Sequence, residues 1–457
     1  MARIAEYTGK SAVENVKKAL AAARQHSEYN ALLSLTEERA LQQAAKVDAG
    51  EISGRLTGVP FVVKDNFLAF GAPTTAASKI LEEFHTPIQA TAVEKLEAEG
   101  AICIGKANLD AFAHGGSTEN SAFGPTKNSA DPSRVAGGSS GGSAVVTALD
   151  IVPFALGSDT GGSIRQPASF NGVVGVKPTY GMVSRYGVVA MASSTDVIGC
   201  FTTTAEDAEL VLEVISGRDT RDMTTLPDYF APTALEQPLK IGLITECMTD
   251  DVDPEVKQAT LKYAEKLRAA GHTVEEVSLP MLKHTLAMYY IIVPAEVTSN
   301  LARYDGVRYG RRASDIATLA ELYGKSRDEG FVTENKRRIM IGSYVLSSGF
   351  FDAYYLQAQK ARTVLIQQFD ELFKTYDVLL TPTAPTPAFE LGENVADPIK
   401  MYLSDIMTVP ASLAGLPAVS VPAGNARSGL PIGVQLIAPQ RKDALLLALA
   451  KQDGETQ

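Results

Sequence analysis

The sequence has few cysteines and no long hydrophobic segment. Its 457 residues include three cysteines, Cys103, Cys200 and Cys247, which are too few and too far apart for a disulfide framework and indicate reduced thiols. No apolar run approaches the ~18 residues of a membrane-spanning helix, and the first residues lack the pattern of a secretory signal. We therefore expect a folded cytoplasmic protein that makes no contact with a membrane.

Positive charge is also scarce. The chain has 42 lysines and arginines against 53 aspartates and glutamates, which gives a net charge of −11. Because proteins bind nucleic acids through clusters of lysine and arginine, this balance disfavours a chain that holds RNA by itself. If RNA is involved, we expect a partner protein to bind most of it.

Only five histidines occur, at positions 26, 85, 114, 272 and 284, and none lies in a motif of a serine–histidine–acid triad. No spacing of cysteine, histidine and carboxylate residues matches a set of metal ligands. We therefore predict that this chain holds no metal and no cofactor of its own, and that any catalytic serine is activated by a group other than histidine.

Strand and helix patterns alternate along much of the chain. Residues 56–63 have the pattern of a buried strand, residues 91–99 that of a helix stopped by glycine, and residues 101–104 that of a strand. The same order recurs at 239–244, 254–271 and 273–277. This alternation predicts an α/β fold with a large mixed central sheet covered by helices on both faces.

The two remaining regions are predicted to be mainly helical. Residues 1–50 contain a capping box at Ser11 and apolar residues at helical spacing, which predicts peripheral amino-terminal helices. Residues 280–375 carry polar and aromatic residues in apolar surroundings, and we expect this mostly helical part to form a pocket. Since no composition shift divides the chain, we predict a single domain over residues 1–457.

Two segments rich in glycine and serine are the most informative feature of the chain. One is Gly137-Gly138-Ser139-Ser140-Gly141-Gly142-Ser143 and the other begins Gly157-Ser158-Asp159-Thr160-Gly161-Gly162-Ser163. One such segment alone is equally typical of a flexible linker. Two of them separated by one helix–strand unit can meet at one end of a sheet, where α/β folds place their sites. Glycines there let backbone amides approach a developing oxyanion.

Lys64 ends a strongly apolar run, so its ammonium group lies at the tip of a buried strand. A structural ion pair with Asp65 or another carboxylate explains such a lysine as well as a catalytic role does. Burial beside hydrogen-bonding serines favours the neutral amine, which can act as a general base.

Together these residues resemble the amidase signature family, whose catalytic groups are a serine, a serine with a cis peptide bond and a lysine. The resemblance implies that Ser163 is the nucleophile, Ser139 the bridging serine and Lys64 the base. It also implies that the backbone amides of Thr160, Gly161, Gly162 and Ser163 form the oxyanion hole.

Within that family the chain is most similar to the A subunits of glutamyl-tRNA(Gln)/aspartyl-tRNA(Asn) amidotransferases. This closer resemblance rests on residues 112–121, 302–310, 337–340 and 415–418. It implies a glutaminase site in which Arg338 pairs with the carboxylate of L-glutamine and Asp405 with its amino group. Tyr289 is implied to help close the pocket, with Tyr290 as the alternative.

The same resemblance implies partners. The released ammonia passes to a B subunit that uses ATP and Mg²⁺ to convert Glu-tRNA(Gln) to Gln-tRNA(Gln), and a small C subunit binds across both, which makes a heterotrimer. Two departures from the family pattern are His114, in place of a methionine near the pocket, and Ala136, in place of a proline.

Two other hypotheses stay open on the sequence. A stand-alone amidase acting on simple aliphatic or aryl amides shares the same catalytic groups and differs only in its pocket. An inactive scaffold subunit is disfavoured because Lys64, Ser139 and Ser163 are all present. The orientation of Arg338 and Asp405 discriminates between the glutaminase and the simple amidase.

Overall fold

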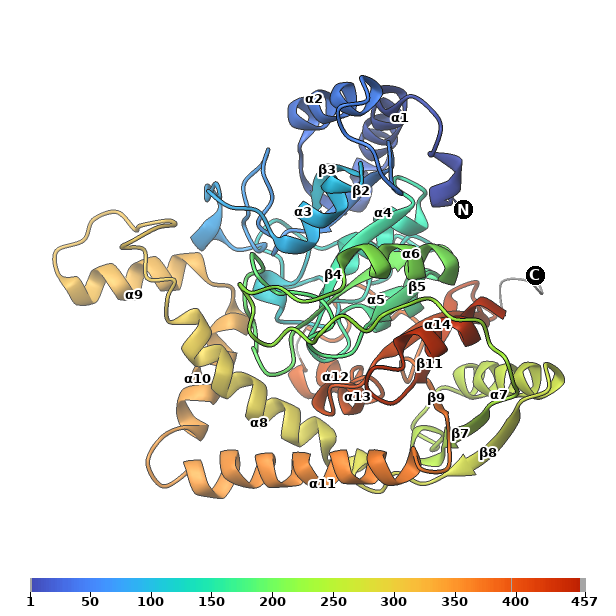
Figure 1. Ribbon diagram of the computed structural model, residues 1–457. Helices are drawn as coiled ribbons and strands as arrows, with labels where there is room; N and C mark the ends of the chain where they lie inside the picture. The colour runs from blue at the N-terminus through green and yellow to red at the C-terminus, as the bar shows by residue number, and fades with distance from the viewer. Residues whose placement is uncertain (1, 396, 453–457) are drawn as a thin grey trace.

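A large mixed sheet runs through the molecule (Figure 1). The computed structural model describes residues 2–395 and 397–452. In this part of the chain 11 strands pair in the order β1-β3-β2-β4-β6-β5-β10-β11-β9-β7-β8. The strands are β1 (Leu32–Leu35), β2 (Pro60–Lys64), β3 (Ile102–Ala107), β4 (Phe154–Asp159), β5 (Val174–Lys177), β6 (Val197–Thr202), β7 (Lys240–Ile244), β8 (Thr273–Val277), β9 (Val378–Pro382), β10 (Ala418–Asn425) and β11 (Pro431–Ile437).

Parallel pairing is confined to the two ends of the sheet. Strands β3, β2 and β4 are parallel near one edge, and β9, β7 and β8 are parallel at the other. The strands between them, and β1 at the first edge, pair antiparallel. The mixed sheet predicted from the sequence is therefore confirmed.

The described residues also form 14 α-helices. They are α1 (Ala12–Gln25), α2 (Glu37–Asp48), α3 (Thr91–Ala98), α4 (Gly141–Ala148), α5 (Arg165–Asn171), α6 (Ala205–Ile215), α7 (Pro254–Ala269), α8 (Leu282–Leu301), α9 (Leu319–Gly330), α10 (Thr333–Val345), α11 (Leu356–Leu372), α12 (Pro398–Leu403), α13 (Val409–Leu413) and α14 (Asp443–Gln452). Short 3₁₀ turns occur at η1 (Ile4–Glu6), η2 (Ser27–Tyr29), η3 (Lys79–Leu81), η4 (Ala111–Ala113) and η5 (Thr245–Cys247), and a π turn at η6 (Phe351–Tyr355). None of the described helices is long and apolar enough to cross a membrane.

Side chains that alternate along the strands place helices on both faces of the sheet. In β2, Phe61 and Val63 belong to an apolar core shared with α3, α6 and α14, whereas Val62 belongs to a core shared with α1, α2 and α4. Because neighbouring strand residues point to opposite faces, a continuously apolar strand needs cover on both. The predicted two-sided covering is confirmed.

Local signals in the sequence explain several helix ends. The Ser11 hydroxyl accepts a hydrogen bond from the backbone N–H of Glu14 at the start of α1, as the capping pattern predicts. Asp253 caps α7 in the same way, and Pro254 occupies its first turn. Between α1 and α2 the structure contains β1, a strand that the sequence analysis did not expect in the amino-terminal region.

The helices between residues 280 and 375 form an extension that packs beside the sheet (Figure 1). Within this extension α8 packs extensively against α10 beside a second apolar core. Gly342 of α10 makes this contact possible, because a side chain there would overlap the carbonyl oxygen of Pro294 inside α8. The two helices carry Tyr289, Tyr290 and Arg338 toward the body of the molecule.

This packing predicts a difference between two glycine-to-alanine substitutions. We expect Gly342→Ala to lower stability by about 1–3 kcal/mol, because the added methyl group forces α8 and α10 apart. Gly324→Ala, in α9, meets open space and should raise stability by about 0.5–1 kcal/mol through better helix propensity. Denaturant unfolding of both variants tests the pair, and a Gly342→Ala protein as stable as Gly324→Ala would contradict it.

Candidate active site

The carboxyl ends of two parallel strands bring the first catalytic candidates together. Lys64 is the last residue of β2 and Asp159 the last of its neighbour β4. Helices α4 and α5 follow the two glycine-rich segments, so both segments reach the same edge of the sheet. The Ser140 backbone N–H donates to the Ser163 carbonyl over 3.1 Å, which joins the two segments directly.

Lys64 is fully buried and surrounded by serine oxygens. Its Nζ lies 2.8 Å from Ser139 Oγ, 3.0 Å from Ser158 Oγ and 3.3 Å from the Ser158 carbonyl oxygen. Burial lowers the pKa of Lys64 to about 7, although the negative charges of Asp110, Asp159 and Asp196 oppose the shift. A neutral amine is therefore well populated near neutral pH, and it can accept a proton from Ser139.

Ser139 follows a cis peptide bond with Gly138, the arrangement that the family resemblance implies. The Gly138 backbone N–H donates to the Gln166 side chain over 2.9 Å, and the Ser139 carbonyl accepts from the Asp110 backbone N–H over 3.3 Å. These bonds hold the serine from both sides, so its hydroxyl keeps its place beside Lys64.

Ser163 lies in the tight turn between β4 and α5 and is 7% exposed. A buried ion pair closes this turn, because Arg165 Nη2 lies 2.8 Å and Nε 3.0 Å from the two carboxylate oxygens of Asp159. Burial by itself raises the pKa of Asp159, but the charge and hydrogen bonds of Arg165 outweigh it, so the net shift is downward. Asp159 therefore stays ionised and clamps the turn that presents Ser163.

The predicted oxyanion turn has no room for side chains. A Cβ on Gly161 would lie 2.7 Å from the Tyr289 hydroxyl, and one on Gly162 would overlap the Thr408 side chain. The Thr408 hydroxyl donates to the Gly161 carbonyl over 2.7 Å, and the Thr160 hydroxyl donates to Asp196 over 2.7 Å. The backbone of this turn is thus held in place before any ligand arrives, as electrostatic preorganisation requires.

Arg338 and Asp405 line one small cavity near this turn. The cavity is also lined by Gly116, whose carbonyl accepts from Gln166 Nε2 over 2.8 Å. Thr408, three residues after Asp405, contacts the oxyanion turn, which ties this cavity to the serine segments. The structure therefore brings together the substrate-binding candidates and the catalytic candidates that lie far apart in the sequence.

The two neighbouring tyrosines of α8 point to different places. Tyr289 packs against Gly161 of the oxyanion turn, whereas Tyr290 lines the cavity. The Tyr290 ring stacks on Tyr402 with centroids 3.9 Å apart, and the Arg338 guanidinium lies 4.4 Å from the Tyr290 centroid. Of the two tyrosines of α8, Tyr290, which the sequence analysis kept as the alternative, is thus the one whose ring the Arg338 guanidinium faces.

Arg338 is a buried cation of this cavity, and Asp405 is a carboxyl group whose pKa is raised there. Arg338 is 2% exposed, its Nε lies 2.6 Å from Glu334 Oε1, and its Nη1 has no hydrogen-bond partner among the described residues. Burial raises the pKa of Asp405 to about 8, with Arg338 acting in the opposite direction. Near neutral pH Asp405 is thus mostly protonated unless a cation lies beside it, because a nearby cation favours its ionised form.

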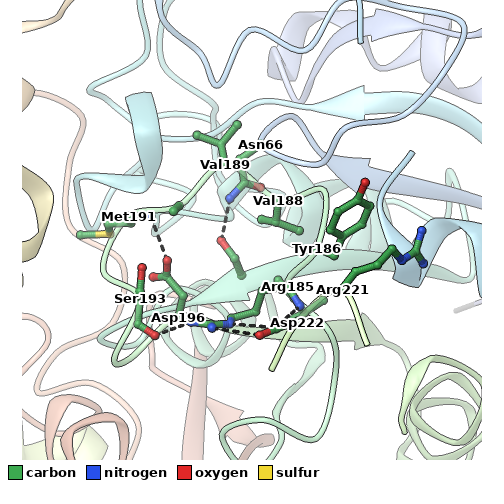
Figure 2. Close-up of a pocket in the computed structure, with 13 residues that line it drawn as sticks. Asn66, Arg185, Tyr186, Val188, Val189, Met191, Ser193, Asp196, Arg221 and Asp222 are labelled. Carbon is green, nitrogen blue, oxygen red and sulfur yellow. Dashed lines mark hydrogen bonds and ion pairs between the residues drawn. The ribbon is translucent and has the colours of Figure 1, made fainter. Parts of the chain in front are cut away.

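Several residues of the site were missed by the sequence analysis. Ser158 and Asn66 complete the surroundings of Lys64, because the Asn66 amide donates to Ser158 Oγ over 3.0 Å. Figure 2 shows Asn66 and Asp196 in a second cavity, which Ser158 also lines. Ser158 lies inside the second glycine-rich segment and Asn66 lies two residues after Lys64. Their closeness in sequence to these motifs is the feature from which they could have been predicted.

The two departures from the family pattern are both buried. His114 has no hydrogen-bond partner for either ring nitrogen within the described residues. Burial, with the nearby charge of Arg338, lowers the pKa of His114 to about 3, so the ring is neutral. Ala136 packs in the apolar core beside α4.

Comparisons with known proteins identify relatives of this chain. A family model described as amidase matches residues 14–447. Curated relatives named as A subunits of glutamyl-tRNA(Gln) amidotransferase include one from Koribacter versatilis, 53% identical over 93% of this chain and 90% of the relative, and one from Gloeobacter violaceus, 51% identical over 96% and 92%. Among solved structures, the corresponding A subunit from Thermotoga maritima superposes with a TM-score of 0.82 at 38% identity and covers 98% of this chain and 93% of its own. A bacterial aryl acylamidase superposes with a TM-score of 0.87 at 25% identity and covers 100% and 96%.

The surroundings of Lys64 predict how the reactivity of Ser163 depends on pH. We expect the rate at which an acylating probe such as p-nitrophenyl acetate modifies Ser163 to rise through about pH 7, as Lys64 loses its proton. Burial raises the pKa of Asp110 itself to about 7, so this side chain carries part of a negative charge in the same range. Asp110→Asn removes that charge, which raises the pKa of Lys64, so the acid limb should move to lower pH. Mass spectrometry of Ser163 across a pH series measures both. Asp131→Asn, in a surface loop, is the control, and an acid limb that moves to higher pH in Asp110→Asn would contradict the prediction.

Proposed function

This chain belongs to the amidase signature family, and we propose that within it the chain is the glutaminase subunit of a tRNA-dependent amidotransferase. The observation that carries the proposal is the cavity that Arg338 and Asp405 share beside the catalytic candidates. A guanidinium group suits the carboxylate of a free amino acid and a carboxylate suits its ammonium group. The identity of 51–54% to curated A subunits, over more than nine-tenths of the chain, supports the same assignment.

The first half of the proposed reaction forms an acyl-enzyme. Ser163 gives its proton to Ser139 while Ser139 gives its own to neutral Lys64, and Ser163 Oγ attacks the side-chain amide carbon of glutamine. The oxyanion receives hydrogen bonds from the backbone amides of residues 160–163. The relay then returns a proton to the amide nitrogen, the C–N bond breaks, and ammonia leaves.

The second half returns the enzyme to its starting state. A water molecule takes the place of ammonia and loses a proton through the same relay, so that hydroxide attacks the acyl carbon. The tetrahedral intermediate collapses, the bond to Ser163 Oγ breaks, and Ser163 regains its proton as glutamate leaves. The lowered pKa of Lys64 supports this route, because the same group must accept and return a proton near neutral pH.

We assign the recognition of glutamine to residues that bind its two charged groups, the α-carboxylate and the α-ammonium. Arg338 binds the carboxylate, for which its unpartnered Nη1 is available, and Asp405 binds the ammonium group. Binding of that ammonium stabilises the ionised form of Asp405, whose pKa burial raises. The tyrosines of α8 close the site, with Tyr289 against the oxyanion turn and Tyr290 against Arg338.

The fate of the ammonia follows from the resemblance to A subunits. The ammonia passes to a B subunit, which holds ATP and Mg²⁺ and converts Glu-tRNA(Gln) to Gln-tRNA(Gln), while a C subunit binds across both. The net charge of −11 supports placing most of the tRNA contact on the partner. A stand-alone amidase for simple apolar amides is the weaker alternative, because a cavity lined by Arg338, Glu334 and Asp405 is poorly suited to an apolar substrate.

The first test of this function is ammonia release from L-glutamine beside a panel of simple aliphatic and aryl amides. We expect release that is selective for glutamine and that Ser163→Ala abolishes, with co-purifying partner subunits retained. Ser133→Ala, at an exposed serine, should behave as the unmodified protein. Turnover by Ser163→Ala would refute the nucleophile, and a preference for simple amides would refute the glutaminase assignment.

A second test addresses Arg338. Loss of a charge-assisted pair should raise the KM for glutamine about 10-fold to 100-fold in Arg338→Ala, while Ser163 stays reactive toward an acylating probe. Lys336→Ala, which removes an exposed cation of the same helix, is the matched control. An unchanged KM in Arg338→Ala would show that the substrate carboxylate binds elsewhere.

A further inference from the structure

One wall of the substrate cavity carries two hydrogen-bond acceptors that have no partner in the described part of the chain. Glu119 and Asn394 both line the cavity. Glu119 Oε2 and Asn394 Oδ1 are buried, and neither has a hydrogen-bond partner within residues 2–395 and 397–452. Asn394 is 5% exposed. Because an unpaired buried acceptor costs free energy, two of them on one wall point to a ligand that donates hydrogen bonds there.

The other carboxylates of the cavity do not share this property. Glu334 is satisfied by Arg337, Arg338 and the Tyr402 hydroxyl, which donates over 2.9 Å. Asp405 has its pKa raised to about 8 by burial, so near neutral pH it carries only part of a negative charge before a ligand binds. The cavity therefore offers Glu119 as a further carboxylate with a free oxygen for a cationic group.

Glu119 is held in place by the loop that carries Asn394. Its Oε1 accepts from the Gly392 backbone N–H over 2.7 Å, which leaves Oε2 for the cavity. Gly392 belongs to the loop that carries Asn394 and leads into α12, so the bond links the two acceptors. On α12, Tyr402 stacks on Tyr290 and connects the same wall to Arg338.

We propose that Glu119 and Asn394 are specificity residues that bind the α-ammonium group of the substrate together with Asp405. An ammonium group has three N–H donors, and the three acceptors Glu119 Oε2, Asn394 Oδ1 and Asp405 match that number. This inference rests on the proposed glutaminase function and deepens it. It requires an amide substrate with a free amino group. It also predicts that Glu119 and Asn394 do not strengthen the binding of an analogue that lacks the amino group.

Comparing two substrates distinguishes binding of the α-ammonium group by Glu119 from a purely structural role of this residue. The first is L-glutamine and the second is 4-carbamoylbutanoate, which is glutamine without its amino group. In Glu119→Gln we expect the KM for glutamine to rise about 10-fold, the size of one lost charge-assisted hydrogen bond, with kcat changed less than about threefold. The KM for 4-carbamoylbutanoate should stay within about twofold. Glutamine at position 119 keeps an oxygen for the Gly392 N–H, so the wall remains in place.

Two further variants sharpen the result. Asn394→Ala should also raise the KM for glutamine relative to the KM for 4-carbamoylbutanoate. Glu393→Gln, on the same loop, is the matched control, because its carboxylate binds Lys400 and the Glu390 backbone outside this cavity, and both KM values should be unchanged. Equal losses for both substrates in Glu119→Gln would overturn the proposal in favour of a structural role, and unchanged values would overturn it outright.

Ammonia release by the unmodified protein shows whether this inference alone has failed or the proposed function has failed as well. Ser163-dependent ammonia release from glutamine, with an unchanged KM in Glu119→Gln, would overturn only the role of this wall. Absence of glutamine hydrolysis by the unmodified protein with its co-purifying partners would overturn both.

Discussion

The buried ion pair between Asp159 and Arg165 is the interaction on which the site depends. It closes the turn that presents Ser163, and its two members are fully buried. Arg165 also donates to the Thr408 carbonyl over 2.8 Å and to the Ser412 hydroxyl over 2.7 Å, so the same guanidinium fixes the segment that carries Asp405. Removing one member would leave a buried charge without its partner, which typically costs about 3–5 kcal/mol. The turn that presents Ser163 and the segment that carries Asp405 are thus held by one cation.

Burial shifts the pKa values of Lys64 and Asp405 in opposite directions. It lowers the pKa of Lys64 toward neutrality and raises that of Asp405. Both shifts have the same physical cause, since a charge is costly where water is excluded. A neutral lysine can serve as a base, whereas a carboxyl group that ionises when a cation arrives favours an amino acid over a neutral amide. Both properties come from burial of ordinary side chains.

The helical extension determines the shape of the pocket. Its helices α8 and α10 approach closely because Gly342 faces Pro294, and this brings Tyr289 to the oxyanion turn and Tyr290 to Arg338. The loop before α12 also lines the cavity through Asn394, and its Gly392 N–H donates to Glu119. The catalytic candidates at the edge of the sheet are therefore combined with binding candidates on helices and loops, an arrangement that lets related chains vary substrate while retaining the sheet.

The sequence by itself determined the α/β class, most strand and helix positions and the three candidates Lys64, Ser139 and Ser163, because periodicity and glycine-rich motifs are local properties. Strand β8, predicted at residues 273–277, has those bounds. Strand β1 escaped prediction because it is four residues long and is stabilised by pairing with β3, which is distant in sequence. The tertiary structure alone decided that Tyr290 contacts Arg338, that Glu119 reaches the cavity and that Asp159 and Arg165 are satisfied by each other. These facts depend on desolvation and on contacts between distant segments, and no local pattern of residues encodes either.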